Sequence, residues 1–231
     1  MQIFSRSLNK LPQIVGAAAT LGLVGVTFLI WYFFSPWFTQ VGYSPTQPVP
    51  YSHRLHAGQL GLDCRYCHAN VERSAVAMVP PTETCMNCHQ VVKTDSAELQ
   101  PIRDSWESGK PVEWVRIHKL ADYVYFDHSV HVTAGVGCIE CHGRIDQMEQ
   151  VRMVKPLSMG WCLECHRDVK ANQVSVAAKD SPDHVAHEQS TSEHIRPVSQ
   201  ITNMDWKREG SAPIDTPRHL NPPENCWGCH R

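Results

Sequence analysis

One short pattern of cysteine and histidine occurs five times in this chain. Two cysteines stand three positions apart, and a histidine follows the second cysteine directly. Numbered first to fifth along the chain, the motifs are Cys64-Cys67-His68, Cys85-Cys88-His89, Cys138-Cys141-His142, Cys162-Cys165-His166 and Cys226-Cys229-His230. Together they use all 10 cysteines of the 231 residues. A pattern that consumes every cysteine points to one repeated chemistry.

Three kinds of chemistry use a Cys-x-x-Cys pair. A zinc site needs cysteines that converge in fours, and it does not require a histidine after each second cysteine. A thioredoxin-like dithiol is single and lies beside a βαβ pattern, which this sequence lacks. Cys-x-x-Cys-His is instead the attachment signature of c-type haem, in which the adjacent imidazole ligates the iron. We therefore predict five covalent c-type haems, with the five motif histidines as proximal ligands.

Histidines outside the motifs are candidates for the sixth position of each iron. Five of them precede the fourth motif: His53, His56, His118, His128 and His131. Residues 51–56 and 126–131 share one pattern, an aromatic residue followed by His-x-x-His, and each copy stands shortly before a motif. On one helical turn such a pair places both imidazoles on nearly the same face, so each can reach a different haem. The duplicated pattern therefore predicts closely packed haems.

The later part of the chain offers weaker candidates. Met204 could ligate an iron, since methionine is an axial ligand that raises the reduction potential. Met78 and Met159 are less favoured for ligation and more typical of packing. Arg196 could pair with a haem propionate. The remaining histidines lie in polar sequence and are poor ligand candidates: His184, His187, His194 and His219.

The composition predicts a fold that depends on its cofactors. The chain carries 16 prolines and a net charge of −2, with a pI near 6.7, so no basic field indicates nucleic-acid binding. Large apolar residues are sparse after about residue 40. We expect a mostly α-helical protein with extensive irregular loops, in which the porphyrins supply much of the core.

The N-terminus carries a second strong signal. Residues 14–34 contain no charge and are long enough to cross a bilayer as one helix. Arg6 and Lys10 precede the segment, and no acidic residue occurs before Asp63, so residues 1–13 are expected in the cytoplasm. A cleaved signal peptide is the alternative, but bulky residues follow the apolar run where a cleavage site needs small ones. Either reading exports the rest of the chain to the periplasmic side of a bacterial inner membrane.

The spacing of the motifs predicts how the exported part is organised. Residues 35–52 are uncharged and proline-containing and read as an extended tether. The pentahaem domain, 53–231, then divides into dihaem modules at 53–89 and 126–166, with a short helix around 96–108 between them. Residues 167–225 are polar and free of cysteine, and we expect a long wrapping loop there. The C-terminal haem motif occupies 226–230.

These features resemble a known family. The paired histidines before Cys-x-x-Cys-His are similar to class III multihaem cytochromes of the c3 and c7 type. The stretches "PVPYSHRLHAGQLGLDCRYCH", "WVRIHKLADYVYFDHSVH" and "PLSMGWCLECHR", together with the anchor, resemble the pentahaem membrane-anchored subunit of alternative complex III. The resemblance runs from about residue 14 to 206 and returns at the last motif, leaving about 207–223 uncovered.

The resemblance implies partners and a role. Such subunits belong to respiratory or photosynthetic complexes that oxidise quinol. Their partners include an iron–sulfur subunit resembling molybdoenzymes, polytopic quinol-binding membrane subunits and a monohaem cytochrome c. Electrons pass on to a cytochrome c, a copper protein or a terminal oxidase. By analogy, the first histidine of each pair would serve the motif just after it, so His53 would serve the first haem and His128 the third.

Two other functions compete with an electron-relay subunit. A stand-alone membrane-anchored quinol dehydrogenase could feed periplasmic reductases, although a single transmembrane helix offers little of a quinol pocket. A catalytic multihaem reductase needs an open iron position and often an altered motif. All five motifs here keep histidine, and candidate sixth ligands outnumber the haems. The sequence thus favours a non-enzymatic electron carrier.

Overall fold

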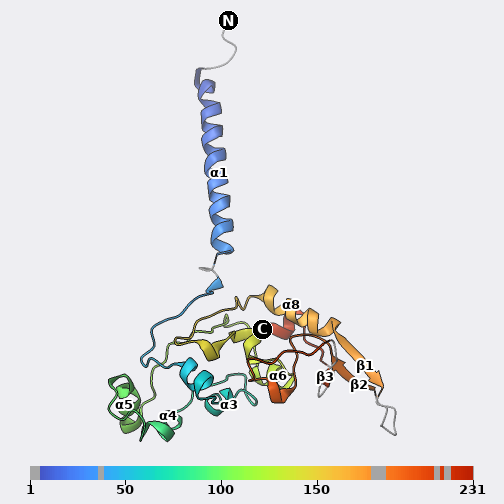
Figure 1. Cartoon of the computed structure of the whole chain (residues 1–231). Coiled ribbons are helices and arrows are strands. Elements are labelled where there is room, and N and C mark those ends of the chain that lie inside the picture. The colour runs from blue at the N-terminus through green and yellow to red at the C-terminus, as the bar shows by residue number, and fades with distance from the viewer. Residues whose placement is uncertain (1–5, 36–38, 178–185, 211–213, 216–219, 231) are drawn as a thin grey trace. The chain divides into compact units, whose positions relative to one another are not determined.

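The computed structural model describes residues 6–35, 39–177, 186–210, 214–215 and 220–230, and only the backbone of 6–7, 173–177, 186–189 and 215. The chain divides into two compact units, Met1–Val41 and Gly42–Arg231. Figure 1 shows the two kinds of architecture, a long helix in the first unit and short helices joined by long connections in the second. The fold is mostly helical with irregular connections, as the sequence predicts.

The first unit is built around one apolar helix. After a 3₁₀ turn at Arg6–Lys10 (η1), helix α1 spans Leu11–Phe33. It starts three residues before the predicted segment because Pro12 suits the first turn of a helix. At 23 residues it is about 35 Å long, enough for a hydrocarbon core of about 30 Å.

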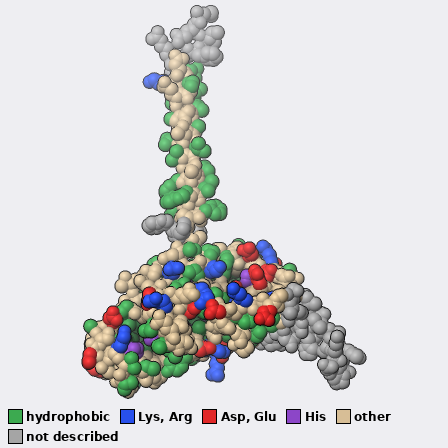
Figure 2. All heavy atoms as spheres, in the orientation of Figure 1, with side chains coloured by type: hydrophobic (Ala, Val, Ile, Leu, Met, Phe, Trp, Pro, Cys, Tyr) green, Lys and Arg blue, Asp and Glu red, His purple; other side chains and the backbone are tan. Residues whose placement is uncertain are grey.

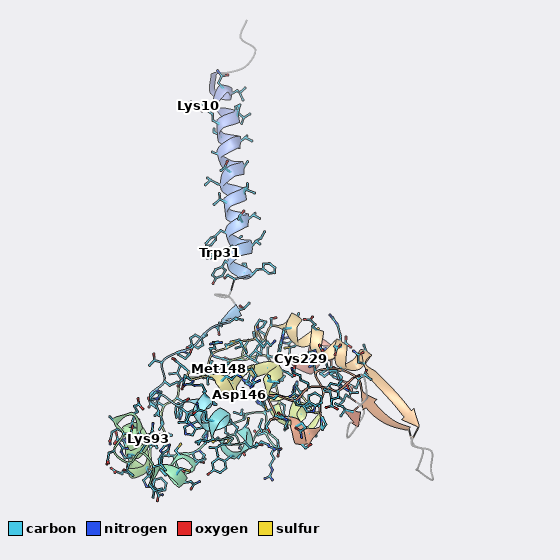
Figure 3. The ribbon with its side chains drawn as sticks, in the orientation of Figure 1. Lys10, Trp31, Lys93, Asp146, Met148 and Cys229 are labelled. Carbon is cyan, nitrogen blue, oxygen red and sulfur yellow. The ribbon has the colours of Figure 1, made fainter. Side chains whose placement is uncertain are left out.

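The surface of α1 matches a lipid environment. None of its residues is buried, and Figure 2 shows apolar side chains along its length. Lys10 stands at one end and Trp31 near the other (Figure 3). Among the described residues, one helical segment, Leu8–Phe33, is both long enough and apolar enough to cross a membrane.

The second unit is a series of short helices in which every Cys-x-x-Cys motif has its own. A π-helical turn at Arg54–Gln59 (η2) precedes α3 (Cys64–Cys67) and α4 (Thr82–His89). The predicted helix around 96–108 is confirmed as η3 (Ala97–Leu99) and α5 (Gln100–Ser108), which ends at left-handed Gly109. The remaining helices are α6 (His128–Thr133), α7 (Cys138–His142), η4 (Ile145–Gln147), α8 (Met159–Ala171), η5 (Val198–Gln200) and α9 (Cys226–Cys229).

The prediction of a long wrapping loop over 167–225 was wrong in part, because this segment contains regular structure. Helix α8 continues to Ala171, and three antiparallel strands follow in the order β1 (Gln173–Ala177), β2 (Ala186–Ser190) and β3 (Ile214–Asp215). Gln173 pairs with Ser190 and Ala177 with Ala186. The signal was present as alternating β-branched Val174 and Val176, which favour a strand.

The apolar core of the second unit is divided into three small clusters. They centre on Val49–Met86–Ile102, Val71–Val132–Ile201 and Val169–Ile195–Leu220. Cys85 packs against the first cluster and Cys165 against the third, so attachment motifs stand at the edges of the clusters. A core this dispersed gives limited hydrophobic stabilisation, which fits the expectation that porphyrins complete it.

Candidate haem-binding sites

Each motif folds as one helical turn that brings its two cysteines together. Residues three apart lie on the same face of a helix, so the two sulfurs of each motif lie together. The histidine continues or ends the turn, and in the fifth motif His230 has an extended backbone. Polar N-caps start three of these turns. Asp63 accepts a hydrogen bond from the Arg65 N–H, Ser158 from the Trp161 N–H, and Asn225 from the Gly228 N–H. The sequence therefore builds the attachment geometry locally.

The thiols themselves fit attachment better than the competing chemistries. None of the ten cysteines forms a disulfide. Burial raises the pKa of Cys141 to about 12 and that of Cys165 to about 11, whereas contact with Cys64 lowers that of Cys138. Among the described residues, no three His, Cys, Asp or Glu side chains converge as a directly bound metal ion would require.

Backbone carbonyls fix the orientation of three motif histidines. The Nδ1 atoms lie 2.6 Å from Met78 O for His68, 3.0 Å from Val92 O for His89 and 2.7 Å from Pro223 O for His166. A carbonyl oxygen only accepts, so Nδ1 must carry the proton in each ring. The lone pair is then on Nε2, which can ligate iron; histidines that bind metals commonly donate their other N–H to a backbone carbonyl in this way.

The same device orients three histidines outside the motifs. His56 Nδ1 donates to Ser52 O at 2.8 Å, His128 to Ala75 O at 2.7 Å and His131 to Asp127 O at 2.7 Å. Burial lowers the pKa of His131, which favours the neutral imidazole that binds metals. These side chains are prepared as ligands in the same way as the motif histidines.

The spacing of the rings tests whether a haem fits between them. Two imidazoles on opposite sides of one iron, with metal–nitrogen bonds of about 2 Å, have ring centroids roughly 6 Å apart. The centroids of His56 and His89 are 6.3 Å apart, those of His128 and His142 6.4 Å, and those of His131 and His166 6.2 Å. The His128 and His142 planes differ by only 8°. Three motifs therefore present an imidazole pair that fits a six-coordinate haem.

His53 lies close to the first motif. Its Nδ1 is buried and has no hydrogen-bond partner among the described residues. Burial lowers the pKa of His53 to about 4, and the neighbouring His68 and His56 add to the effect. A buried nitrogen without a partner is costly, and an iron bound at this Nδ1 would supply the missing partner.

His118 occupies a different position from the other candidates. Its ring meets that of His142 edge-on at 4.5 Å, which is too close for an iron between them. Its Nε2 is buried with no hydrogen-bond partner in the part of the chain that the structure describes, and burial lowers the pKa of His118. His118 therefore stays a prediction as a ligand, and it is not the partner of His142.

The remaining candidates stay predictions. Met204 is half-buried, Met159 is 64% exposed, and no ring or hydrogen-bond contact joins either described sulfur to a motif. The backbone of Met78 supports His68, which gives this residue a role other than ligation. His184, His219 and the side chain of His187 lie outside the described residues. In the fifth motif, His230 contacts the ring of Tyr123 at 5.7 Å.

A charged cluster lies beside the third motif. The sequence analysis singled out Arg196 but did not predict its charged partners. The guanidinium of Arg196 is buried, donates to Glu140 Oε1 at 2.6 Å and lies 5.0 Å from the ring centre of Trp206. Glu140 also pairs with His194, and this hydrogen bond raises the pKa of His194. A Cβ at Gly137 would lie 2.3 Å from the guanidinium, so any larger residue there would require Arg196 to shift. The cluster thus packs directly against the residue before Cys138.

Two comparisons with known proteins agree with this geometry. Residues 124–231 match the profile of the family described as "Cytochrome c7 and related cytochrome c". The chain is also 34% identical, over 97 residues, to the menaquinone reductase multihaem cytochrome c subunit of Nitratidesulfovibrio vulgaris. That similarity covers 42% of this chain and 45% of the relative, so the chain spans less than half of the protein it matches. Residues 124–231 are thus similar to the c7-type multihaem cytochromes, a family whose members carry c-type haem.

Proposed function

We propose that this chain is a membrane-anchored pentahaem cytochrome c that transfers electrons as a subunit of a quinol-oxidising complex of the alternative complex III type. The observation that supports it best is the set of three imidazole pairs with centroids 6.2–6.4 Å apart. A motif histidine facing a second, preoriented histidine suits an iron that exchanges electrons without binding substrate.

Each haem would be held by this chain's own residues. The ten motif cysteines would attach the porphyrins, and the five motif histidines would supply the proximal nitrogens. His56, His128 and His131 would complete the second, third and fourth sites, and His53 the first. When bound, haem supplies a one-electron couple between ferric and ferrous iron. The protein contributes imidazoles, six of which are held in one orientation by backbone carbonyls.

The remaining features suit a place in a membrane complex. Helix α1 would anchor the cytochrome domain on the periplasmic side of a bacterial inner membrane. In such a complex, an iron–sulfur subunit and polytopic quinol-binding subunits would exchange electrons with the cytochrome. A monohaem cytochrome c, a copper protein or a terminal oxidase would accept them. These partners follow from the resemblance to alternative complex III.

The similar protein of N. vulgaris raises a second candidate that differs in direction. It is named as a subunit of a menaquinone reductase, in which quinone is reduced. The same cytochrome could therefore receive electrons from a periplasmic donor and pass them toward menaquinone.

Purification in mild detergent tests the proposal and separates the two directions. We expect co-purifying membrane subunits, five covalent haems per chain by pyridine haemochrome and no carbon monoxide binding by the isolated cytochrome. Haem reduction by menaquinol in the complex would support quinol oxidation, whereas menaquinone reduction by pre-reduced complex would support the reverse. Rapid reduction of the isolated chain by quinol would contradict a subunit role.

A further inference from the structure

The spatial order of the five motifs differs from their order in the sequence. Contacts between the first and second motifs form one link. Asn87, between Cys85 and Cys88, donates a hydrogen bond to the hydroxyl of Tyr66, between Cys64 and Cys67, at 3.1 Å. In η2, His56 faces the second motif, and His53, one turn earlier, lies beside His68 of the first. The ring centre of Tyr51 lies 4.8 Å from that of His53 and 4.4 Å from that of His56.

The first motif also touches the third. The thiols of Cys64 and Cys138 are neighbours, since each shifts the pKa of the other. Residues 201–202 join the starts of both helices, because Ile201 O accepts from the Cys138 N–H at 3.0 Å and Thr202 donates to Asp63 at 2.9 Å. The two dihaem modules therefore meet through their first members.

The third and fourth motifs are linked by α6 as the first and second are by η2. His128 faces His142 of the third motif, and His131 faces His166 of the fourth. Phe126 contacts both histidines, at 4.8 and 4.5 Å, in the place that Tyr51 takes in the first module. The internal repeat of the sequence is thus also a repeat of the contacts that join two haem sites.

The fourth motif continues to the fifth. His166 donates to the carbonyl of Pro223, three residues before Cys226, at 2.7 Å. Lys170 and Arg167 of α8 form ion pairs with Glu224 at 3.0 and 3.4 Å. Figure 3 shows Cys229 close to α8.

Exposure gives an independent indication of where the series ends. Of the ten cysteines, Cys88 and Cys226 are exposed and the other eight are half-buried. The exposed cysteines belong to the second and fifth motifs, the two ends of the contact series. Trp227, in the fifth motif, is 86% exposed.

We infer that the haem sites form one unbranched series in the order second, first, third, fourth, fifth. The second and fifth motifs are accordingly the two surfaces where partner redox proteins exchange electrons with this chain. The inference rests on the proposed electron-transfer function and adds to it the route and its two ends.

Iron positions in crystals of the detergent-solubilised, haem-loaded full chain test the order directly. Anomalous scattering locates each iron, and the attached cysteines identify it. We expect the first iron to be the nearest neighbour of the second, and the fourth to be the nearest neighbour of the fifth. A second iron nearest to the third or fourth, or a fifth iron nearest to the first or second, overturns the order. This result does not depend on whether quinol is oxidised, so it can fail separately from the proposed function.

A solution experiment uses matched removal of single haems. The double change Cys85→Ala/Cys88→Ala identifies the electron paramagnetic resonance signal of the second haem by its loss. Removing the first haem, with Cys64→Ala/Cys67→Ala, should then abolish the magnetic coupling of that signal. Removing the fifth, with Cys226→Ala/Cys229→Ala, should leave it unchanged. If removal of the fifth haem abolishes the coupling and removal of the first does not, the proposed series is wrong. If a variant does not accumulate in cells, the iron positions in the crystal test the order instead.

Discussion

At the scale of single residues, histidine orientation is set by backbone carbonyls. Six imidazoles, three within motifs and three outside, donate from Nδ1 to a carbonyl oxygen at 2.6–3.0 Å. A ring so anchored loses little additional freedom when its Nε2 binds iron. Changing one such ring should therefore affect one haem, while the others keep their ligands.

The variant His128→Ala tests this expectation. It removes the ring that lies 6.4 Å from His142, so one haem should become high-spin and acquire carbon monoxide binding. The remaining haems should stay low-spin by absorption and electron paramagnetic resonance spectra. His194→Ala is the matched control, because His194 pairs with Glu140 and should leave the spin state unchanged. A His128→Ala spectrum identical to wild type would remove this residue from the ligand set.

Asp63 links the first motif to residues 201–202 and makes stability depend on pH. Hydrogen bonds from Arg65, aided by Thr202, lower its pKa from 3.8 to about 2. A carboxylate with a lowered pKa stabilises the fold above its unfolded value, and this contribution is lost as the pH falls from about 4 to about 2. The free energy of unfolding should thus fall in this range.

Asp63→Asn separates the charge from the cap, since asparagine is also a good N-cap residue. In thermal unfolding followed by Soret circular dichroism, the variant should show a weaker dependence on pH between about 4 and 2 than wild type. Asp95→Asn, at an exposed acid outside the motifs, should keep the wild-type dependence. Equal slopes for all three proteins would show that Asp63 does not contribute.

At the scale of elements, short helices depend on small apolar clusters for their placement. Ile201 is 1% exposed, packs with Val71 and Val132, and accepts the hydrogen bond that starts α7. Ile201→Ala should lower the free energy of unfolding by about 2–5 kcal/mol, as expected for truncating a buried aliphatic side chain. Val198→Ala, at a 38% exposed residue three positions earlier, should have a much smaller effect. Similar losses in urea unfolding of both variants would contradict this role.

The elements show what sequence could predict. The five attachment turns, α1 and the helix near 96–108 were predictable, because motif spacing, apolar length and terminators are local signals. The strands at 173–177 and 186–190 were not predicted, since two alternating valines in a polar segment are a weak pattern. The sequence also could not predict that His56 pairs with His89, or that Arg196, Glu140 and His194 form a cluster. They depend on contacts between residues up to 56 positions apart, which periodicity does not encode.

At the scale of the whole molecule, the chain divides into a unit with an apolar helix and a second unit that begins at Gly42 and contains all five motifs. The described part of the second unit mixes acidic and basic side chains on the face shown in Figure 2, whereas α1 is apolar. Such a division predicts that membrane attachment and haem binding can be separated by cutting the chain between the two units.

Deleting residues 1–41, behind a cleavable secretion signal, tests that separation. The truncated protein should be recovered in soluble form with the haem content and absorption spectrum of the full chain, because all five motifs lie after residue 41. The full chain should instead stay in the membrane fraction after washing with high salt, since a spanning helix of 23 residues is held by apolar burial and not by charge.

Replacing Leu21 and Leu23 by aspartate in the full chain provides a matched control. Charges near the bilayer centre oppose insertion by about 2.5–3.5 kcal/mol each, so this variant, exported behind the same cleavable secretion signal, should lose membrane attachment without losing haem. A mature N-terminus near residue 40 in the wild-type protein would instead identify the helix as a cleaved signal peptide.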